Sequence, residues 1–145
     1  MLIRKMIIED YERVYQLWMS CSGMGLNNLD DSKEGIAKFL DRNPQTCFVA
    51  ENDKVVGVIF AGNDGRRGYI YHTAVHPDYR SQGIATDLVK SVEQAMKNLN
   101  INKIALVAFE RNESGNAFWE KQGYSLRTDL SYRNKSLMDM IRIDT

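Results

Sequence analysis

Hydrophobic and polar residues follow two periods along the chain, and the period of each segment predicts its secondary structure. Segments with alternating or continuous apolar residues, bounded by glycine, asparagine or aspartate turns, are typical of β-strands. These segments are 2–7, 46–50, 54–61, 68–75, 101–109, 124–130 and 136–143. The turns that join the second, third and fourth segments are short, which predicts an antiparallel meander.

Four other segments carry apolar residues at helical spacing, between residues that favour helix termini. They run from Asp10 to Cys21, from Asp31 to Asn43, from Gly83 to Asn100 and from Asn112 to Gly123. Asp10 is expected to cap the first helix, and Asp31 with Glu34 fits a capping box at the start of the second. The pair Asn43-Pro44 is expected to stop that second helix.

The order of these elements predicts one α+β domain over residues 1–145. A helix lies between strands 68–75 and 101–109, so we expect these strands to be parallel neighbours joined by a right-handed crossover. The whole pattern predicts a mixed, mostly antiparallel sheet of six to seven strands, with about four helices on its two faces.

Composition narrows the classes of function. The chain has 19 basic and 19 acidic residues, so it lacks the basic excess that nucleic-acid or anionic-membrane binding usually needs. Apolar runs reach only about 5 residues where a membrane helix needs about 20, and the first residues lack a signal-peptide pattern, so we expect a cytoplasmic protein. Cys21 and Cys47 stand far apart, which favours two reduced thiols over a metal site.

Residues 80–83 read Arg-Ser-Gln-Gly and separate strand 68–75 from the helix that begins at Gly83. A helix start presents unpaired backbone N–H groups and the positive end of the helix dipole, and a glycine lets an anion approach them closely. Arg80 adds a cation at the rim. The same pattern also fits an ordinary turn with a solvated Arg80. Neither G-x-G-x-x-G nor G-K-[ST] is present, which argues against nucleotide triphosphate chemistry.

Three stretches of the sequence resemble one family. Residues 80–85, RSQGIA, are similar to the R/Q-x-x-G-x-G/A signature of the GNAT N-acetyltransferases, with Ala85 in place of the commoner glycine. Residues 112–124, NESGNAFWEKQGY, are similar to that family's second signature. Residues 71–77, YHTAVHP, resemble its central strand and exit turn. With the order of elements, the resemblance covers essentially the whole chain.

The resemblance implies a GNAT-like fold, with a central parallel strand pair splayed by a bulge, and acetyl-coenzyme A as co-substrate. The pyrophosphate is expected at the start of the helix at Gly83, and the pantetheine arm beside strand 68–75 and the start of the helix at Asn112. The implied cofactor-binding residues are Thr73, Ala74, Val75, Arg80, Ser81, Gln82, Gly83, Ile84, Ala85, Thr86, Asn112, Asn116 and Trp119. No metal is expected.

The implied reaction transfers the acetyl group to a primary amine by direct attack in a ternary complex. Such a reaction needs a proton acceptor, hydrogen-bond donors for the carbonyl oxyanion, and a way to release the thiolate. A backbone N–H near Ala74 or Val75 is the natural oxyanion donor. His72 is a candidate base because an imidazole changes charge near neutral pH, and Glu110 is an alternative that acts through water. On an alternating strand, Tyr71 projects to the face opposite His72.

The general acid departs from the family pattern. Many members have a tyrosine where this chain has Trp119, and an indole N–H donates a hydrogen bond but not a proton. Tyr124 and Tyr132 are candidate substitutes, and a thiol with a pKa of about 8.5 can also leave as the thiolate. The candidate catalytic residues are His72, Tyr71, Trp119 and Tyr124.

The resemblance also implies that the loop at 22–31 helps to bind the amine acceptor. Its apolar residues suit a lining for the open side of the acetyl group, and its two aspartates could attract a cationic amine. Asp30 and Asp31 also fit the simpler role of helix caps. The candidate acceptor-binding residues are Met24, Leu26, Leu29 and Asp30.

Three functions remain open at this stage. The leading one is an acetyl-coenzyme A dependent N-acetyltransferase acting on a small-molecule or peptide amine. The second is a catalytically weak or inactive module that only binds acyl-coenzyme A, for which Trp119 is the main argument. The third is a purely structural α+β domain. Nucleic-acid and membrane partners are not expected, whereas an exposed C-terminal strand would allow two copies to form a homodimer.

Overall fold

A computed structural model describes residues 1–143 and shows a five-stranded sheet in the order β1-β2-β3-β4-β5. The strands are β1 (Leu2–Lys5), β2 (Phe48–Glu51), β3 (Val55–Asn63), β4 (Gly68–Val75) and β5 (Ile104–Leu106). β1 to β4 pair antiparallel, and β4 pairs with β5 in parallel. The predicted meander and the predicted parallel neighbours are therefore confirmed.

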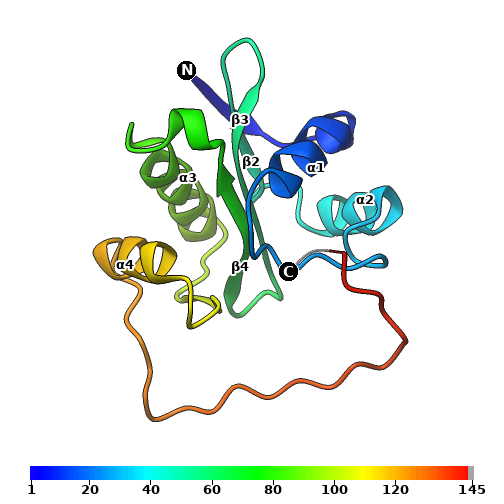
Figure 1. Ribbon diagram of the computed structural model, residues 1–145. Coiled ribbons are helices and arrows are strands. Elements are labelled where there is room, and N and C mark those ends of the chain that lie inside the picture. Colours follow the sequence, from blue (N-terminus) through cyan, green and yellow to red (C-terminus); the bar gives the residue numbers. More distant parts are fainter. Residues whose placement is uncertain (144–145) are drawn as a thin grey trace.

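Helices cover both faces of the sheet (Figure 1). They are α1 (Tyr11–Met19), α2 (Lys33–Arg42), α3 (Ile84–Asn98) and α4 (Glu113–Lys121), with short 3-10 turns η1 (Ile8–Asp10) and η2 (Pro77–Tyr79). α1 and α2 pack on one face around Trp18 and Val58, whereas α3 packs on the other around Leu88 and Ile70, with α4 beside it. Among residues 1–143, no helix has the length and apolar character that a membrane crossing requires.

The start of α1 differs from the prediction. Asp10 holds the N-cap position, but its carboxylate does not bond to the helix. The carboxylate is buried and instead accepts two hydrogen bonds from Arg4, at 2.9 and 2.8 Å, one from Arg13 and one from the Ile7 N–H. Burial alone would raise the pKa of Asp10, but the Arg4 and Ile7 hydrogen bonds outweigh it and hold this pKa below its usual range.

The start of α2 also differs from the prediction. The cap is Ser32, whose hydroxyl accepts a hydrogen bond from the Gly35 N–H at 3.0 Å. The predicted capping box between Asp31 and Glu34 is therefore wrong, and the carboxylate of Asp31 is available for a contact elsewhere. α2 ends at Arg42, directly before the Asn43-Pro44 pair, as predicted.

β4 is irregular at its centre. Between Ile70 and Thr73 it advances three residues while β3 advances two, which makes a β-bulge at Tyr71 and His72. Pairing between β4 and β5 ends at Ile70, although β4 itself continues to Val75. The central parallel pair is therefore splayed from the bulge onwards, as the family resemblance implied.

The sheet has fewer strands than predicted. In residues 1–143, the segments 124–130 and 136–143 form no strand, apart from a single antiparallel bridge between Arg142 and Asn27. β5 is also shorter than the predicted strand 101–109. Alternating apolar residues make a segment fit to be a strand, but a strand also needs a partner edge, and the sequence pattern does not supply one.

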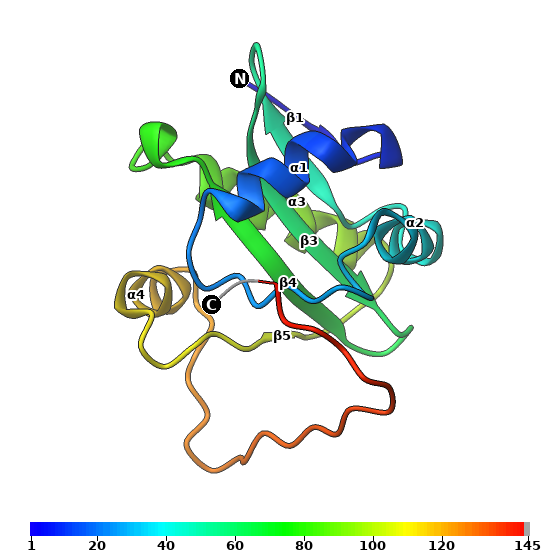
Figure 2. The ribbon, with the colours of Figure 1, turned by 45° about the vertical axis from the view of Figure 1, so that its right-hand side comes forward.

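Residues 125–140 form a segment that we call the arc. It leaves the end of α4, bows away from the sheet and returns beside the loop that precedes α2 (Figure 2). Its return is fixed by backbone hydrogen bonds of 3.0 Å from Asn28 N to the Ile141 oxygen and from Ile143 N to the Leu26 oxygen. Several of its apolar side chains are largely exposed, among them Leu137 at 89%.

Candidate active site

The crossing between β4 and α3 has the geometry of an anion site. Gly83 is the N-cap residue of α3 and has φ 82°, and Ser81 also has a positive φ of 63°. A Cβ at Gly83 would meet nothing within 4 Å, so the space in front of the helix start is open. Because the first N–H groups of a helix have no partner within the helix, they face this space together with the positive end of the dipole.

Arg80 is held at the rim of the crossing. Its Nε donates to the Val75 oxygen at 3.0 Å, and its Nη2 lies 3.4 Å from the Cys21 sulfur. The Cys21 thiol in turn lies 3.9 Å from the same Val75 oxygen. The end of α1 thus helps to position the arginine, which the sequence pattern did not indicate.

The start of α4 and its predicted asparagines lie in one hydrogen-bonded turn. Asn112 caps α4 by accepting from the Gly115 N–H at 3.0 Å. The Asn116 amide donates to the Phe109 oxygen at 3.0 Å and to the Asn112 oxygen at 2.9 Å. At the other end of α4, the Gln122 amide donates to the Thr86 hydroxyl at 3.0 Å and so ties α4 to the first turn of α3.

Trp119 and Tyr124 belong to an aromatic cluster between α4 and α3. The Trp119 ring centroid lies 5.0 Å from that of Phe118 and 5.3 Å from that of Tyr124. The Tyr124 hydroxyl donates to a carboxylate oxygen of Glu93 at 2.9 Å. Burial, the Glu93 hydrogen bond and its negative charge all raise the pKa of Tyr124 well above its usual range. The Tyr124 proton is therefore bound to a carboxylate on α3.

The edge of β4 beyond the bulge presents backbone groups towards the gap that β5 leaves. His76 N donates to the Val56 oxygen on β3, and successive residues of a strand direct their N–H groups to opposite edges. The N–H groups of Val75 and Thr73 therefore point away from β3. Ala74 points its N–H towards β3, and its side chain is buried against the α1 face. Of the two oxyanion donors that the sequence left open, the register favours Val75.

The bulge changes which side chains share a face. Regular alternation predicts Tyr71 and His72 on opposite faces, and this prediction is wrong. Both rings lie on the α1 and α2 side: Tyr71 is 5.7 Å from Phe39 of α2, and His72 is 4.9 Å from Trp18 of α1. An extra residue in a strand lets two consecutive side chains face the same way, which the sequence alone does not reveal.

His72 forms a buried pair with Asp31. Nε2 of His72 lies 2.7 Å from Oδ1 of Asp31, and the two side chains are 14% and 3% exposed. Asp31 also accepts from the Asn27 N–H at 2.9 Å, and its backbone oxygen accepts from the Tyr11 hydroxyl at 2.7 Å. The pair joins the bulge of β4 to the loop before α2. The sequence signal was the doubled Asp30-Asp31, which fitted a helix cap equally well.

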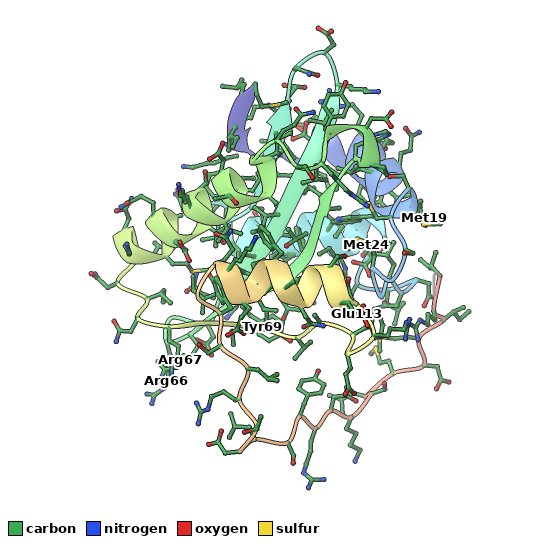
Figure 3. All side chains as sticks on the ribbon, turned by 60° about the vertical axis from the view of Figure 1, so that its left-hand side comes forward. Met19, Met24, Arg66, Arg67, Tyr69 and Glu113 are labelled. Atoms are coloured by element: carbon green, nitrogen blue, oxygen red, sulfur yellow. The ribbon has the colours of Figure 1, made fainter. Side chains whose placement is uncertain are left out.

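The predicted acceptor-binding residues divide into two groups. Leu26 is 1% exposed in the core, and Met24 packs against that core, at the edge seen beside the start of α4 at Glu113 (Figure 3). Leu29 and Asp30 instead line a cavity of about 390 Å³, whose other walls come from arc residues 134–138 and 140. The arc is a part of this site that the sequence analysis missed, because it was read as two strands of the sheet.

Tyr71 connects this cavity to the bulge. Burial raises the pKa of Tyr71, and the neighbouring Tyr132 phenol of the arc and the Asp30 carboxylate raise it further. The bulge, the loop before α2 and the arc therefore meet at one place. Glu110, the alternative base, lies exposed after β5.

Comparison with known proteins agrees with the site. The model of the acetyltransferase (GNAT) family matches residues 11–124 of the chain. An acetyltransferase of Sodalis glossinidius is 34% identical over 140 residues, which cover 96% of this chain and 97% of the relative. An acetyltransferase of Pectobacterium atrosepticum is 35% identical over 117 residues, covering 80% of this chain and 82% of the relative.

Solved structures share the fold at lower identity. The PaiA N-acetyltransferase of Thermoplasma acidophilum, solved in complex with coenzyme A, has a TM-score of 0.77 at 21% identity and covers 87% of this chain and 90% of its own. Ard1 of Thermoplasma volcanium also has a TM-score of 0.77, at 19% identity, with 88% and 84% covered. The chain is an acetyltransferase that belongs to the GNAT family.

Proposed function

We propose that the chain transfers an acetyl group from acetyl-coenzyme A to the primary amine of a small molecule or peptide, by direct attack in a ternary complex. One observation carries the proposal. Within the described residues, β5 leaves β4 after Ile70, and the edge so uncovered leads from the His72–Asp31 pair to the start of α3. One line of backbone thus joins an anion-binding helix start to a histidine held by a buried carboxylate.

The coenzyme is proposed to lie along this line. When bound, acetyl-coenzyme A supplies an activated thioester whose position the chain determines. The N–H groups at the start of α3 and the Arg80 guanidinium suit a pyrophosphate, and Gly83 leaves room for it. The Thr73 and Val75 backbone suits an extended arm with amide groups, as a peptide adds to a sheet edge. Asn112, Asn116 and Trp119 would border the arm from α4.

His72 is proposed to accept the proton of the amine. A carboxylate can only accept hydrogen bonds, so Nε2 carries the hydrogen that points to Asp31, and Nδ1 keeps the lone pair. The buried Asp31 carboxylate then fixes the ring and stabilises the imidazolium that forms when Nδ1 takes a proton. Glu110 acting through water remains the alternative base.

The oxyanion and the leaving group require two further roles. The Val75 N–H is proposed to donate to the carbonyl oxygen as negative charge develops there. For the leaving group we propose departure as the thiolate. Trp119 has no proton to give, the Tyr124 proton is bound to Glu93, and Tyr132 is 66% exposed on the arc.

The acceptor is proposed to be a cationic amine with an apolar portion. Asp30 is the acidic residue of the 390 Å³ cavity, and Leu29 and Met140 supply apolar surface beside it. Lys135 of the arc also lines the cavity, so the site has both signs of charge. This lining suits a small molecule or a peptide end that carries an amine near a hydrogen-bonding group.

A thermal-shift and thiol-release screen tests the proposal. Acetyl-coenzyme A should raise the melting temperature, and at least one amine from a panel of polyamines, amino acids, aminoglycosides and peptide N-termini should release free coenzyme A thiol. Stabilisation without thiol release from any amine would instead favour the alternative function, an acyl-coenzyme A binding module in which Trp119 replaces the usual acid. The absence of both responses would contradict the coenzyme site itself.

A further inference from the structure

The first half of the arc has the pattern of an amphipathic β-strand. Leu126, Leu130 and Tyr132 alternate along one side of it and are 81%, 63% and 66% exposed. On the other side Arg127 donates two hydrogen bonds to Asp129, at 2.9 and 2.8 Å, so the two polar side chains face the same way. This spacing is that of an extended chain with one apolar and one polar face.

The sheet has an edge that matches this segment. Its edges are β1 and β5, and each behaves differently. β1 carries Arg4 and Lys5, and charged residues on an edge strand discourage further pairing. β5 reads Ile-Ala-Leu without a charge, is followed by Val107 at 54% exposure, and pairs with β4 alone among residues 1–143. The β5 edge is therefore open to another strand.

The same chain does not bring these two surfaces together. One end of the arc is fixed by the hydrogen bond from Tyr124 N to the Trp119 oxygen, and the other by the bonds of Ile141 and Ile143 to residues 26–28. Between these anchors the arc bows away from β5 in both views (Figures 1 and 2). An apolar strand face and an uncharged strand edge are thus presented separately by one molecule.

We propose that the segment Leu126–Tyr132 of one copy pairs with the β5 edge of a second copy, and that the second copy returns the same contact. Two identical chains related by a two-fold axis satisfy both surfaces in one closed dimer, with none left over for further growth. The Arg127–Asp129 pair stays in solvent, so no charge is buried without a partner. The dimer does not depend on coenzyme binding, and its tests are separate from those of the acetyl transfer.

Mixed cross-linking between two differently tagged copies tests the contact directly. Both copies carry Cys21→Ser, since the remaining Cys47 is buried and its pKa is raised to about 12, which keeps it unreactive. One copy also carries Val107→Cys beside β5, and the other Leu130→Cys on the arc. With a bis-maleimide, the mixture should yield a species with both tags. Cross-linking only within a chain that carries both cysteines would overturn the proposal, because the arc would then cover its own edge.

Light scattering with a matched pair of charged variants provides the second test. The wild-type chain should have about twice its monomer mass of 16.7 kDa. Leu130→Asp, on the apolar face, should weaken the dimer at least tenfold, whereas Ser131→Asp, one position along and on the opposite face, should leave the dimer intact. Both residues are exposed, and circular dichroism checks that each variant is folded. A wild-type monomer at all concentrations, or equal effects of the two variants, would overturn the proposal.

Discussion

The two ends of the active site are built from different materials. At the crossing, the site consists of backbone: the start of α3, the positive φ of Gly83 and the open space in front of it. At the bulge, it consists of side chains from elements far apart in sequence, above all His72 and Asp31. A backbone site follows from a short local pattern, whereas a side-chain site depends on how distant segments pack.

The largest effect should come from blocking the crossing. Gly83→Glu would place a negative side chain in front of the helix start and should weaken coenzyme binding more than about 100-fold, which is about 2.7 kcal/mol. Gly65→Glu is the matched control, because Gly65 has a similar φ of 86° and open surroundings but lies in the β3–β4 turn. Calorimetric titration with acetyl-coenzyme A measures both. Equal affinities for the two variants would mean that the anion site lies elsewhere.

The next effect concerns the scaffold of the α1 side and its dependence on pH. The pKa of Asp10 is lower in the folded chain than in the unfolded chain, so this carboxylate stabilises the fold at neutral pH, and the stabilisation is lost as the pH falls below about 4. Asp10→Asn should cost about 2–3 kcal/mol at pH 7 through its charged hydrogen bonds and should flatten the acid dependence. Melting curves from pH 7 to pH 3 measure this, with Asp53→Asn in an exposed turn as the control. Parallel acid profiles for wild type and Asp10→Asn would contradict the assignment.

A smaller effect should separate the bulge from the crossing. Asp31→Asn keeps an acceptor for the Asn27 N–H but removes the charge that stabilises a protonated His72. Turnover should fall about tenfold or more with coenzyme affinity unchanged, since positioning partners of a catalytic group are typically worth 10- to 100-fold. Asp30→Asn is the neighbouring control and should act on the Michaelis constant for the amine. A loss of coenzyme affinity in Asp31→Asn would show that the two ends of the site are not independent.

The smallest effect should come from restoring the usual tyrosine. Trp119→Tyr offers a proton donor in the aromatic cluster, but a cluster shaped for an indole does not hold a phenol in an optimal position. We expect turnover to rise by less than about tenfold, with coenzyme affinity unchanged. Single-turnover thiol release measures the chemical step. A fall in turnover would show that the indole itself takes part.

The sequence predicted the crossing well because its features are local. A glycine after an arginine, at the start of a run with helical spacing, already defines a helix start with open N–H groups. The positions of Arg80, Gly83 and Asn112 in the structure agree with that pattern. The prediction of strands at 124–130 and 136–143 failed because alternation describes one strand and not its partner.

The bulge and its pair lay outside what the sequence could predict. Tyr71 and His72 were assigned to opposite faces because a regular strand alternates, and a single extra residue in β4 brings them to one face. Asp31 was read as a cap because capping is the commonest local use of an aspartate before a helix. Its contact with His72 joins residues 41 positions apart, and no local pattern reports such a distance.

The sequence by itself determined the order of the strands and helices, the parallel pair and the backbone site at Gly83, because hydrophobic period and turn chemistry act over a few residues. Only the tertiary structure decided which side chains meet at the bulge, how Asp31 is used and which edge of the sheet stays open. Those outcomes depend on the packing of both faces of one sheet, and packing is a property of the whole chain.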